Sequence, residues 1–360
     1  MRNCSGQTLF LSFIPHFVGF FNKKMRYSLD FCIYRYYKVS FCVIQKMKKA
    51  LFILFTLLFC SFFTARAQYD VHFTHYWEMQ NFYNPAGAGA TRQLHAFAAY
   101  SNQLSGFQGN PKSMLINADM PLSMFRNDHS IGIGVLNDEI GMFVHQHLYM
   151  NYAYAMKLFG GRLAAGVQLG LLNAKFEPKE LNLGENKDDP AFPSGAVDGN
   201  KLDFGAGVLY QHKYFYAGLS ALHINAPLIE MGERNQFQVD PYLNFMAGGN
   251  IKLKNPLISI QPSLLLMTDF VAWRADITAR GIYNYEGKKL FAGATYSPAT
   301  SVAFFAGLEF SNITLSYGYE MFTSGIGAQN GSHDIYIGYD IELNLGKKGK
   351  NKHNSIRILK

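Results

Sequence analysis

The feature that most constrains this chain is an alternation of apolar and polar residues with a period of two. From Asp334 to Leu343, every second residue is apolar or aromatic. A strand places two such sets on opposite faces, whereas a helix would spread both around its axis. Ten residues also match the length of a tilted strand that crosses a membrane, about 9–11 residues. The apolar face comprises Ile335, Ile337, Tyr339, Ile341 and Leu343, and the other face comprises Asp334, Tyr336, Gly338, Asp340 and Glu342.

The same alternation recurs in three earlier segments, 144–156, 163–171 and 202–210. In each segment an apolar face is paired with a face of glycine, histidine, amide or acidic residues. Short polar turns connect several of the expected strands. Residues 211–213 lead into 214–223, and residues 286–289 lead into 290–296. This order predicts antiparallel hairpins.

A soluble β-sandwich also alternates, so further observations decide between the two classes. The expected strands are near ten residues long, which exceeds the usual five or six. Tyr and Phe gather near strand ends, as in the aromatic girdles of outer-membrane barrels. The inner face holds Gly, Asn, Gln and Asp, which suits a polar lumen. We predict an all-β fold, a transmembrane antiparallel up-and-down β-barrel of about 14 strands that spans residues 91–346.

The N-terminal region has the layout of an export signal. Met47-Lys48-Lys49 precedes a 14-residue apolar run from Ala50 to Phe63, and Ala65-Arg66-Ala67 follows as a small-x-small cleavage pattern. The run is shorter than the about 20 residues of a membrane-spanning helix. We expect a cleaved signal peptide at 47–67 and a mature chain that begins near Gln68. Cys60 raises lipidation as an alternative, although Phe59 stands where a lipidation motif has a small residue.

Residues 1–46 show no clean helix or strand period, and we interpret them as an upstream extension from a misplaced start codon. An unusually long start of the signal peptide is the alternative. Residues 1–67 hold ten of the 33 Lys and Arg residues but one of the 25 acids. The remainder therefore has 23 basic and 24 acidic residues, a net charge near −1. The basic overall charge gives no support for nucleic-acid binding.

All four cysteines lie within the first 60 residues, so the mature chain has neither disulfides nor thiolate metal sites. A polar segment from Glu177 to Lys201 interrupts the alternation with nine charged residues and three prolines. We expect it to be a surface loop, since outer-membrane barrels have long extracellular loops and short periplasmic turns. The final segment, 347–360, is basic, and we expect it on the periplasmic side.

No HExxH, GxSxG, P-loop or complete GxGxxG motif occurs, and we expect neither an enzyme nor a cofactor. His145 and His147 share a strand face and could hold a metal, but a third ligand cannot be placed, so lumen-facing histidines are the preferred interpretation. Three acids of the polar loop could coordinate calcium, although their spacing fits no EF-hand; they are Asp188, Asp189 and Asp198. The carboxylates of Asp119, Asp269 and Asp276 could pair with a His and a Ser, as in barrel lipases, but their spacing does not support this.

Several short elements follow one another in a specific order. Asp70, Phe73, Thr74 and Tyr76 are followed by Asn84-Pro85-Ala86-Gly87-Ala88-Gly89. Further elements are Gly106-Phe107-Gln108-Gly109-Asn110-Pro111, Asp119-Met120-Pro121-Leu122, 204–207, 216–220 and 331–335. From about Tyr69 to Leu345 this order resembles the PorP/SprF family of Bacteroidota. The chain departs from it at Gly87, where the family usually has Tyr, and at 100–103, where it lacks an Arg and a Trp.

The resemblance implies an outer-membrane component of the type IX secretion system. Such a protein would sit in the cell outer membrane of a Gram-negative bacterium. It would support the secretion or surface attachment of cargo, including gliding adhesins, by binding periplasmic and outer-membrane secretion components. A transport barrel for small or hydrophobic solutes is the alternative, and a barrel enzyme such as a lipase is a third possibility.

We expect partner contacts in a periplasmic N-terminal segment, 68–90, because aromatic residues are favoured contact anchors. The alternative is that these side chains plug or brace the floor of the barrel. The candidate partner-binding residues are Tyr76, Trp77, Tyr83, Asn84 and Pro85.

Overall fold

The chain divides into two units, 1–65 and 66–360, and the computed structural model describes residues 71–124, 127–177, 195–232, 235–323 and 330–342 of the second. The predicted signal peptide and upstream extension lie outside these residues, as does the basic C-terminal tail. No helix in the described ranges is both long enough and apolar enough to cross a membrane.

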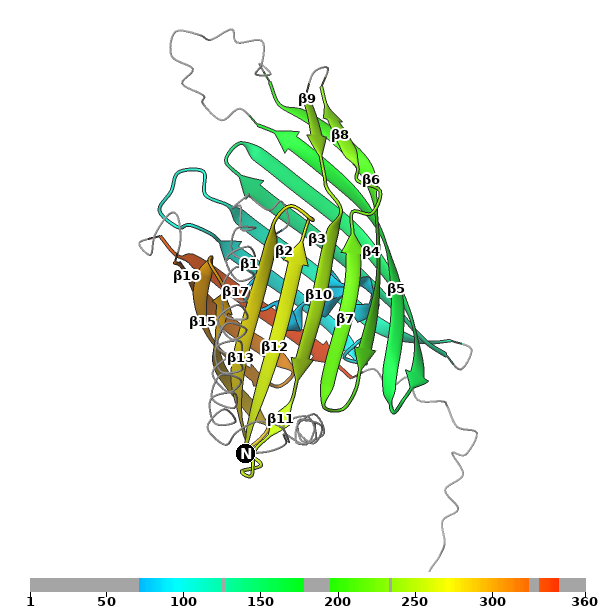
Figure 1. Ribbon diagram of the computed structural model, residues 1–360, viewed down its shortest axis with the longest axis vertical. Coiled ribbons are helices and arrows are strands. Elements are labelled where there is room, and N and C mark those ends of the chain that lie inside the picture. The colour runs from blue at the N-terminus through cyan, green and yellow to red at the C-terminus, as the bar shows by residue number, and fades with distance from the viewer. Residues whose placement is uncertain (1–70, 125–126, 178–194, 233–234, 324–329, 343–360) are drawn as a thin grey trace, which may run out of the picture. The chain divides into compact units, whose positions relative to one another are not determined.

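The second unit is an antiparallel β-barrel whose wall strands pair with their neighbours along the chain (Figure 1). The strands are β1 (Leu94–Asn102), β2 (Lys112–Met124), β3 (Asn127–Ile140), β4 (Phe143–Leu158), β5 (Gly161–Phe176), β6 (Val197–Gln211), β7 (Phe215–Leu222), β8 (Leu228–Met231), β9 (Asn235–Gln238), β10 (Tyr242–Gly249), β11 (Ile251–Lys252), β12 (Ile258–Thr268), β13 (Trp273–Tyr285), β14 (Lys288–Ser297), β15 (Ser301–Phe310), β16 (Ile313–Phe322) and β17 (Ser332–Ile341).

The sheet closes because β1 pairs with β17 along its whole length, from Leu94 opposite Ile341 to Asn102 opposite His333. β10 pairs with both β7 and β12, and the short β11 continues β10 along β12. β8 and β9, which lie between β7 and β10 in sequence, form a separate hairpin. The barrel therefore has 14 strands, which confirms the predicted architecture.

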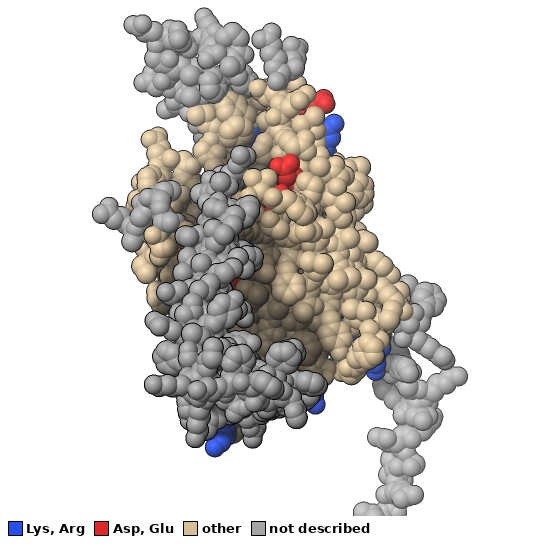
Figure 2. Space-filling view, in the orientation of Figure 1, with Lys and Arg blue, Asp and Glu red and all other residues tan. Residues whose placement is uncertain are grey.

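The strands present opposite chemistry to their two faces. In β17, Ile335, Ile337 and Tyr339 point outward and are exposed, whereas Asp334 and Tyr336 point inward and are buried, as predicted. The same division holds in β4, β5 and β6, where the exposed outer side chains are apolar. Buried polar residues of the inner face include Asn117, Asn151, Gln168, Asp203, Asn244, Asp276, Thr278 and Glu320. Most of the visible charged residues on the face in Figure 2 lie near its upper and lower ends.

The polar loop is shorter than predicted. β6 begins at Val197 and pairs with β5 from Phe176 opposite Val197 onward, so the assignment of residues 197–201 to a loop was wrong. Asp198 lies on the outer face, where this part of β6 extends past the apolar band and no longer needs apolar residues, whereas Lys201 lies on the inner face opposite Leu172. Residues 178–194 lie outside the described part of the chain.

The two ends of the barrel differ in their connections. At one end, strands are joined by 125–126, 159–160, 212–214, 253–257, 286–287 and 311–312, and β1 begins and β17 ends there. This is the short-turn end. The other end, the long-loop end, has connections that include 103–111, 177–196 and 223–241. In outer-membrane barrels the short turns face the periplasm.

The β8–β9 hairpin belongs to the long-loop end, at the top of Figure 1. Its apolar side chains Ile229 and Met231 are buried with Leu172 and Ala174 of β5. Phe237 stacks on the inward-facing ring of His145, with ring centroids 4.9 Å apart. The hairpin therefore packs against the inner face of β4 and β5 near the long-loop end.

The face assignment predicts opposite effects for two substitutions in one strand. Ile337→Arg would place a charge on the outer face near the middle of β17, and we expect it to lower the free energy of unfolding in lipid vesicles by about 2–4 kcal/mol. Asp340→Arg, at the short-turn rim, should cost less because its side chain lies on the inner face. Denaturant unfolding in vesicles measures both. A larger loss for Asp340→Arg would mean that the register is wrong by one residue.

Candidate functional site

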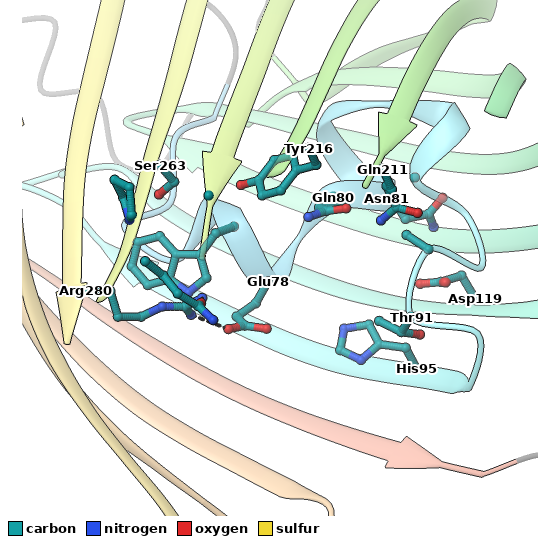
Figure 3. Close-up of a pocket in the computed structure, with 16 residues that line it drawn as sticks. Glu78, Gln80, Asn81, Thr91, His95, Asp119, Gln211, Tyr216, Ser263 and Arg280 are labelled. Carbon is teal, nitrogen blue, oxygen red and sulfur yellow. Dashed lines mark hydrogen bonds and ion pairs between the residues drawn. The ribbon is translucent and has the colours of Figure 1, made fainter. Parts of the chain in front are cut away.

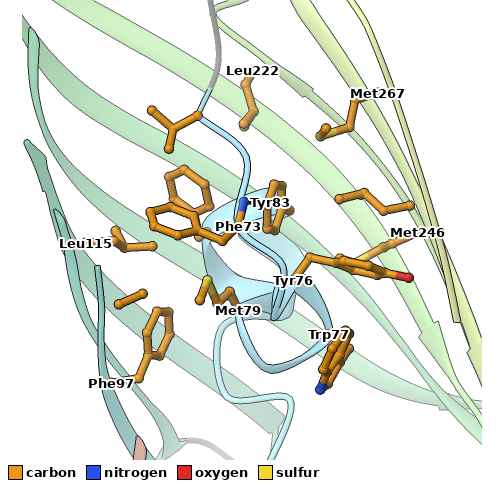
Figure 4. Close-up of a cluster of buried hydrophobic side chains, with 14 of the residues drawn as sticks. Phe73, Tyr76, Trp77, Met79, Tyr83, Phe97, Leu115, Leu222, Met246 and Met267 are labelled. Carbon is orange, nitrogen blue, oxygen red and sulfur yellow. Dashed lines mark hydrogen bonds between the residues drawn. The ribbon is translucent and has the colours of Figure 1, made fainter. Parts of the chain in front are cut away.

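Residues 71–90 lie inside the barrel and fill the middle of its lumen (Figure 4). We call this segment the plug. It contains the 3₁₀ helix η1 (Tyr76–Glu78), the single-turn helix α2 (Gln80–Tyr83) and the 3₁₀ helix η2 (Pro85–Gly87). Its aromatic residues pack together and against wall residues such as Phe97, Leu115 and Met246.

The structure brings all five candidate partner-binding residues into the plug, where each is buried; they are Tyr76, Trp77, Tyr83, Asn84 and Pro85. This corrects the expectation that 68–90 is a periplasmic segment, as far as its described residues 71–90 are concerned. The physical reason is that these aromatic rings bury apolar surface against the barrel wall, whereas in a periplasmic segment the same surface would be exposed to water. Partner binding through these side chains stays a prediction.

A buried polar network holds the start of the plug to the wall. His72 Nε2 lies 2.8 Å from Asp276 Oδ2, and Asp276 also accepts from Arg274 Nε at 3.0 Å. Arg274 Nη2 in turn lies 2.7 Å from Glu320 Oε1. The hydroxyls of Ser297 and Ser301 donate to Asp276 and Glu320 respectively. Each buried charge in this network has an opposite charge as its neighbour, as a low-dielectric interior requires.

The next residues of the plug bond to other strands. The Thr74 backbone N–H donates to Asp334 Oδ2 at 2.6 Å. His75 Nε2 lies 2.7 Å from the Ser316 hydroxyl, and the Tyr76 hydroxyl donates to Thr278 at 3.0 Å. Burial, with a smaller contribution from the Arg280 guanidinium, lowers the pKa of His75 to about 3. The imidazole is therefore neutral at physiological pH.

The Asn84-Pro85-Ala86 element has a local explanation. Asn84 Oδ1 accepts from the Ala86 N–H at 2.9 Å and so caps η2, and Pro85 occupies the first helical position, where no N–H is needed. Asn84 Nδ2 donates to the Val208 carbonyl of β6 at 3.0 Å. One side chain thus shapes the plug and ties it to the wall.

Amide and hydroxyl side chains join the plug to further wall strands. Asn151 Nδ2 of β4 donates to the Asn81 carbonyl at 2.8 Å, and Asn81 Nδ2 donates to Asn117 Oδ1 at 3.1 Å. The Tyr83 carbonyl accepts from the Ser220 hydroxyl at 2.6 Å and from Asn244 Nδ2 at 3.0 Å. Buried polar groups are costly unless paired, so these bonds fix the plug in one position.

Glycine makes this close approach possible. A Cβ at Gly166 of β5 would overlap the backbone nitrogen of Ala86. Backbone cannot give way as a flexible side chain can, so only glycine lets η2 pack directly on the wall.

At the short-turn end the plug forms the roof of two cavities of about 320 and 880 Å³. Glu78, Gln261 and Arg280 line both, so the cavities adjoin. Figure 3 shows the residues that line the smaller cavity, among them Glu78 and Arg280. Glu78 Oε1 lies 2.5 Å from Arg280 Nη1, and the guanidinium stacks 4.9 Å from the centre of the Trp77 ring. Beside the plug toward the long-loop end, two further cavities each have a volume of about 20 Å³, roughly the space of one water molecule.

The residues considered for chemistry have structural roles here. Asp203 lies 3.3 Å from His147 Nε2 and 2.9 Å from His223 Nδ1. Within the described ranges, no group of three or more His, Cys, Asp or Glu side chains could hold a metal ion. Asp198 lies in β6, and Asp188 and Asp189 lie outside the described residues.

The three carboxylates considered for a lipase mechanism also have local partners. Asp119 accepts from the Gly89 N–H at 2.7 Å, and Asp269 accepts from the Ala272 N–H at 2.6 Å. Asp276 contacts both His72 and Ser297, so the acid lies between them. A catalytic triad instead requires the histidine to lie between the serine nucleophile and the acid, so these three residues do not have that order.

Sequence reasoning missed most of the wall residues that hold the plug. Arg274, Asp276, Thr278 and Arg280 alternate along the inner face of β13, and this period of two could have marked them as lumen-facing. Their partners in the plug lie about 200 positions earlier in the chain. No local pattern indicates which charge meets which.

Substitution of Arg274 should show the importance of the buried ions. Arg274→Met would leave Asp276 and Glu320 buried without their shared cation, and we expect a loss of about 3–5 kcal/mol in the free energy of unfolding. Adding Asp276→Asn and Glu320→Gln to this variant should recover part of that loss, because the uncompensated charges are then gone. Denaturant unfolding measures both variants, and equal stability of Arg274→Met and the unmodified protein would contradict the assignment.

A larger side chain at Gly166 should displace the plug. We expect Gly166→Val to raise the ion conductance of the purified barrel in planar bilayers, because the new Cβ would collide with the backbone of η2. Gly281→Val is the matched control, since the nearest atom to a Cβ there is 3.8 Å away. Unchanged conductance of a folded Gly166→Val protein would show that the plug tolerates the side chain.

Comparison with known proteins gives one family. The family described as "Type IX secretion system membrane protein PorP/SprF" matches residues 65–339. No curated protein sequence matches the chain. Solved structures to which the chain is similar include the CymD monoaromatic hydrocarbon channel, with 12% identity and a TM-score of 0.46 over 73% of this chain and 92% of that chain. A Pseudomonas aeruginosa FadL homologue has 10% identity and a TM-score of 0.43, over 74% and 94%.

Proposed function

Because this chain belongs to the type IX secretion system membrane protein PorP/SprF family, we propose that it supports the secretion or surface attachment of cargo proteins by binding partners. The protein is an outer-membrane β-barrel. Its proposed partners are periplasmic and outer-membrane secretion components and the secreted cargo or adhesin. We propose no catalytic role.

The observation that supports this proposal most directly is the plug. Twenty residues of the protein's own chain occupy the lumen and bond to wall strands from β2 to β17. Beside the plug, the described cavities toward the long-loop end have space for about one water molecule each. A lumen filled in this way suits a protein that acts through its surfaces and contacts better than one that passes solutes continuously.

The short-turn end is the surface proposed to face the periplasmic machinery. Outer-membrane barrels place short turns and both termini on the periplasmic side. In this protein β1 begins and β17 ends at that rim, and the two large cavities are at that end. Exposed polar connections and an accessible cavity are what a periplasmic partner could contact.

Deletion of the gene tests the function. We expect the deletion strain to lose particular proteins from its surface and culture medium, with export restored by the full-length gene. Quantitative mass spectrometry of the secreted and surface fractions measures this. The control compares total outer-membrane protein, which should not change. Unchanged export of every surface protein, together with lost uptake of a small solute, would reject the secretion role in favour of transport.

A further inference from the structure

The two adjoining cavities under the plug have the size of a ligand site. We call them together the chamber, and their volumes of about 320 and 880 Å³ lie in the range typical of binding pockets, about 300–1,000 Å³. The roof is Trp77, Glu78 and Gln80 of the plug, and the lining residues of the wall come from β1, β2, β6, β7 and β10 to β17. Lys252, Lys254 and Glu342 line the mouth at the short-turn rim.

Four residues that line the chamber each have a buried polar atom without a hydrogen-bond partner among the described residues. The atoms are the indole N–H of Trp77, the amide oxygens of Gln80 and Asn250, and the hydroxyl of Tyr216. Trp77 is 5% exposed, so its N–H is a buried donor. Buried polar groups are normally paired, with protein, water or a ligand. The set combines donors and acceptors, which suits a polypeptide backbone with its alternating N–H and C=O groups.

Among the charged residues that line the chamber, two lysines and two acids, Asp119 and Glu342, form no ion pair with a described residue. Arg280 pairs with Glu78, Lys289 pairs with Glu309 at 2.6 Å, and His95 pairs with Asp340 at 2.7 Å. Lys252 and Lys254 form no ion pair with any described residue, and both are exposed at the mouth.

The rim around the mouth is also basic. The exposed cations at the short-turn end are Arg92, Lys157, Lys213, Lys252, Lys254, Lys288 and Lys289. The described acids at that end whose side chains are at least partly exposed are Glu286, Glu309, Asp340 and Glu342. The excess of positive charge favours an acidic ligand.

The mouth also has a short free strand edge. The pairing of β10 with β7 ends at Gly249 opposite Phe215, and Asn250 N–H donates to the Tyr214 carbonyl. Beyond that point Ile251 and Lys252 pair with β12 alone. Such an edge can pair with an extended peptide through backbone hydrogen bonds.

We propose that the chamber binds an extended, acidic polypeptide segment of a periplasmic protein, which enters past Lys252 and Lys254 and reaches Trp77 and Gln80 of the plug. This rests on the proposed function and names the chemistry of the partner and its site. The lysines attract the acidic side chains, and the unpartnered donors and acceptors bind the peptide backbone.

Trp77 supplies a direct readout, because the chain has two tryptophans and the other, Trp273, lies on the outer face of β13. In a Trp273→Phe background of the full chain in detergent, Trp77 fluorescence is titrated with a capped (Asp-Gly)₃ peptide. A capped (Lys-Gly)₃ peptide and the disaccharide chitobiose are the comparison probes. We expect a saturable change with the acidic peptide alone, weakened by added salt.

Matched charge variants locate the site. We expect Lys252→Gln with Lys254→Gln to weaken the acidic peptide about tenfold, in line with exposed ion pairs of up to about 1 kcal/mol each. Lys213→Gln with Lys288→Gln removes the same charge from the same end at positions that do not line the chamber, and should leave the affinity within about twofold. Equal weakening by both pairs would place the peptide on the rim and overturn the chamber site.

Other outcomes also overturn the proposal. These are binding of chitobiose alone, equal binding of the two peptides, or no saturable response from a folded barrel. Its failure is distinct from failure of the proposed function, because the gene deletion tests secretion separately. Lost secretion in the deletion strain without peptide binding would reject the chamber site and leave the secretion role standing.

Discussion

The structure depends on closure of the sheet by β1 and β17. Inside a bilayer no water can pair with exposed N–H and C=O groups, so every strand must have a neighbour on both sides. Antiparallel pairing along the whole of β1 supplies the last set of bonds and removes the two free edges. Eight strands already enclose a space that side chains can fill, so 14 strands leave a wider lumen that needs either water or further protein.

The plug meets that need with a segment that comes just before the barrel in sequence. Its polar groups bond to inward-facing residues of the wall, and its aromatic rings bury apolar surface that water would otherwise contact. The arrangement also makes the fold sensitive to substitution. Arg274, Asp276 and Glu320 stabilise it together, but removal of one leaves the others as uncompensated buried charges that destabilise it. Plug and wall therefore form one packed unit, with space left on the short-turn side.

Sequence reasoning predicted the barrel because a period of two is a local property. The outer and inner faces of β17 follow from ten consecutive residues, and so does the side on which Ile337 lies. The position of the plug does not follow in this way. Thr74 bonds to Asp334 and Asn84 bonds to Val208, contacts that span 260 and 124 positions, and no short window contains both partners. Asp276 was visible as a lone carboxylate, but its partners His72 and Arg274 could be assigned only in three dimensions.

A disulfide between plug and wall tests most directly whether the N-terminal segment occupies the lumen. A Cβ at Gly318 of β16 would lie 3.3 Å from the Cβ of Thr74, close to the about 3.5–4.5 Å of a disulfide. The chain beyond residue 60 has no cysteine to interfere. Thr74→Cys with Gly318→Cys should crosslink nearly completely in the folded, membrane-inserted barrel, whereas Thr74→Cys with outward-facing Tyr317→Cys should not. Absence of the crosslink, with the thiol introduced by Thr74→Cys freely labelled by a water-soluble maleimide, would contradict a plugged barrel.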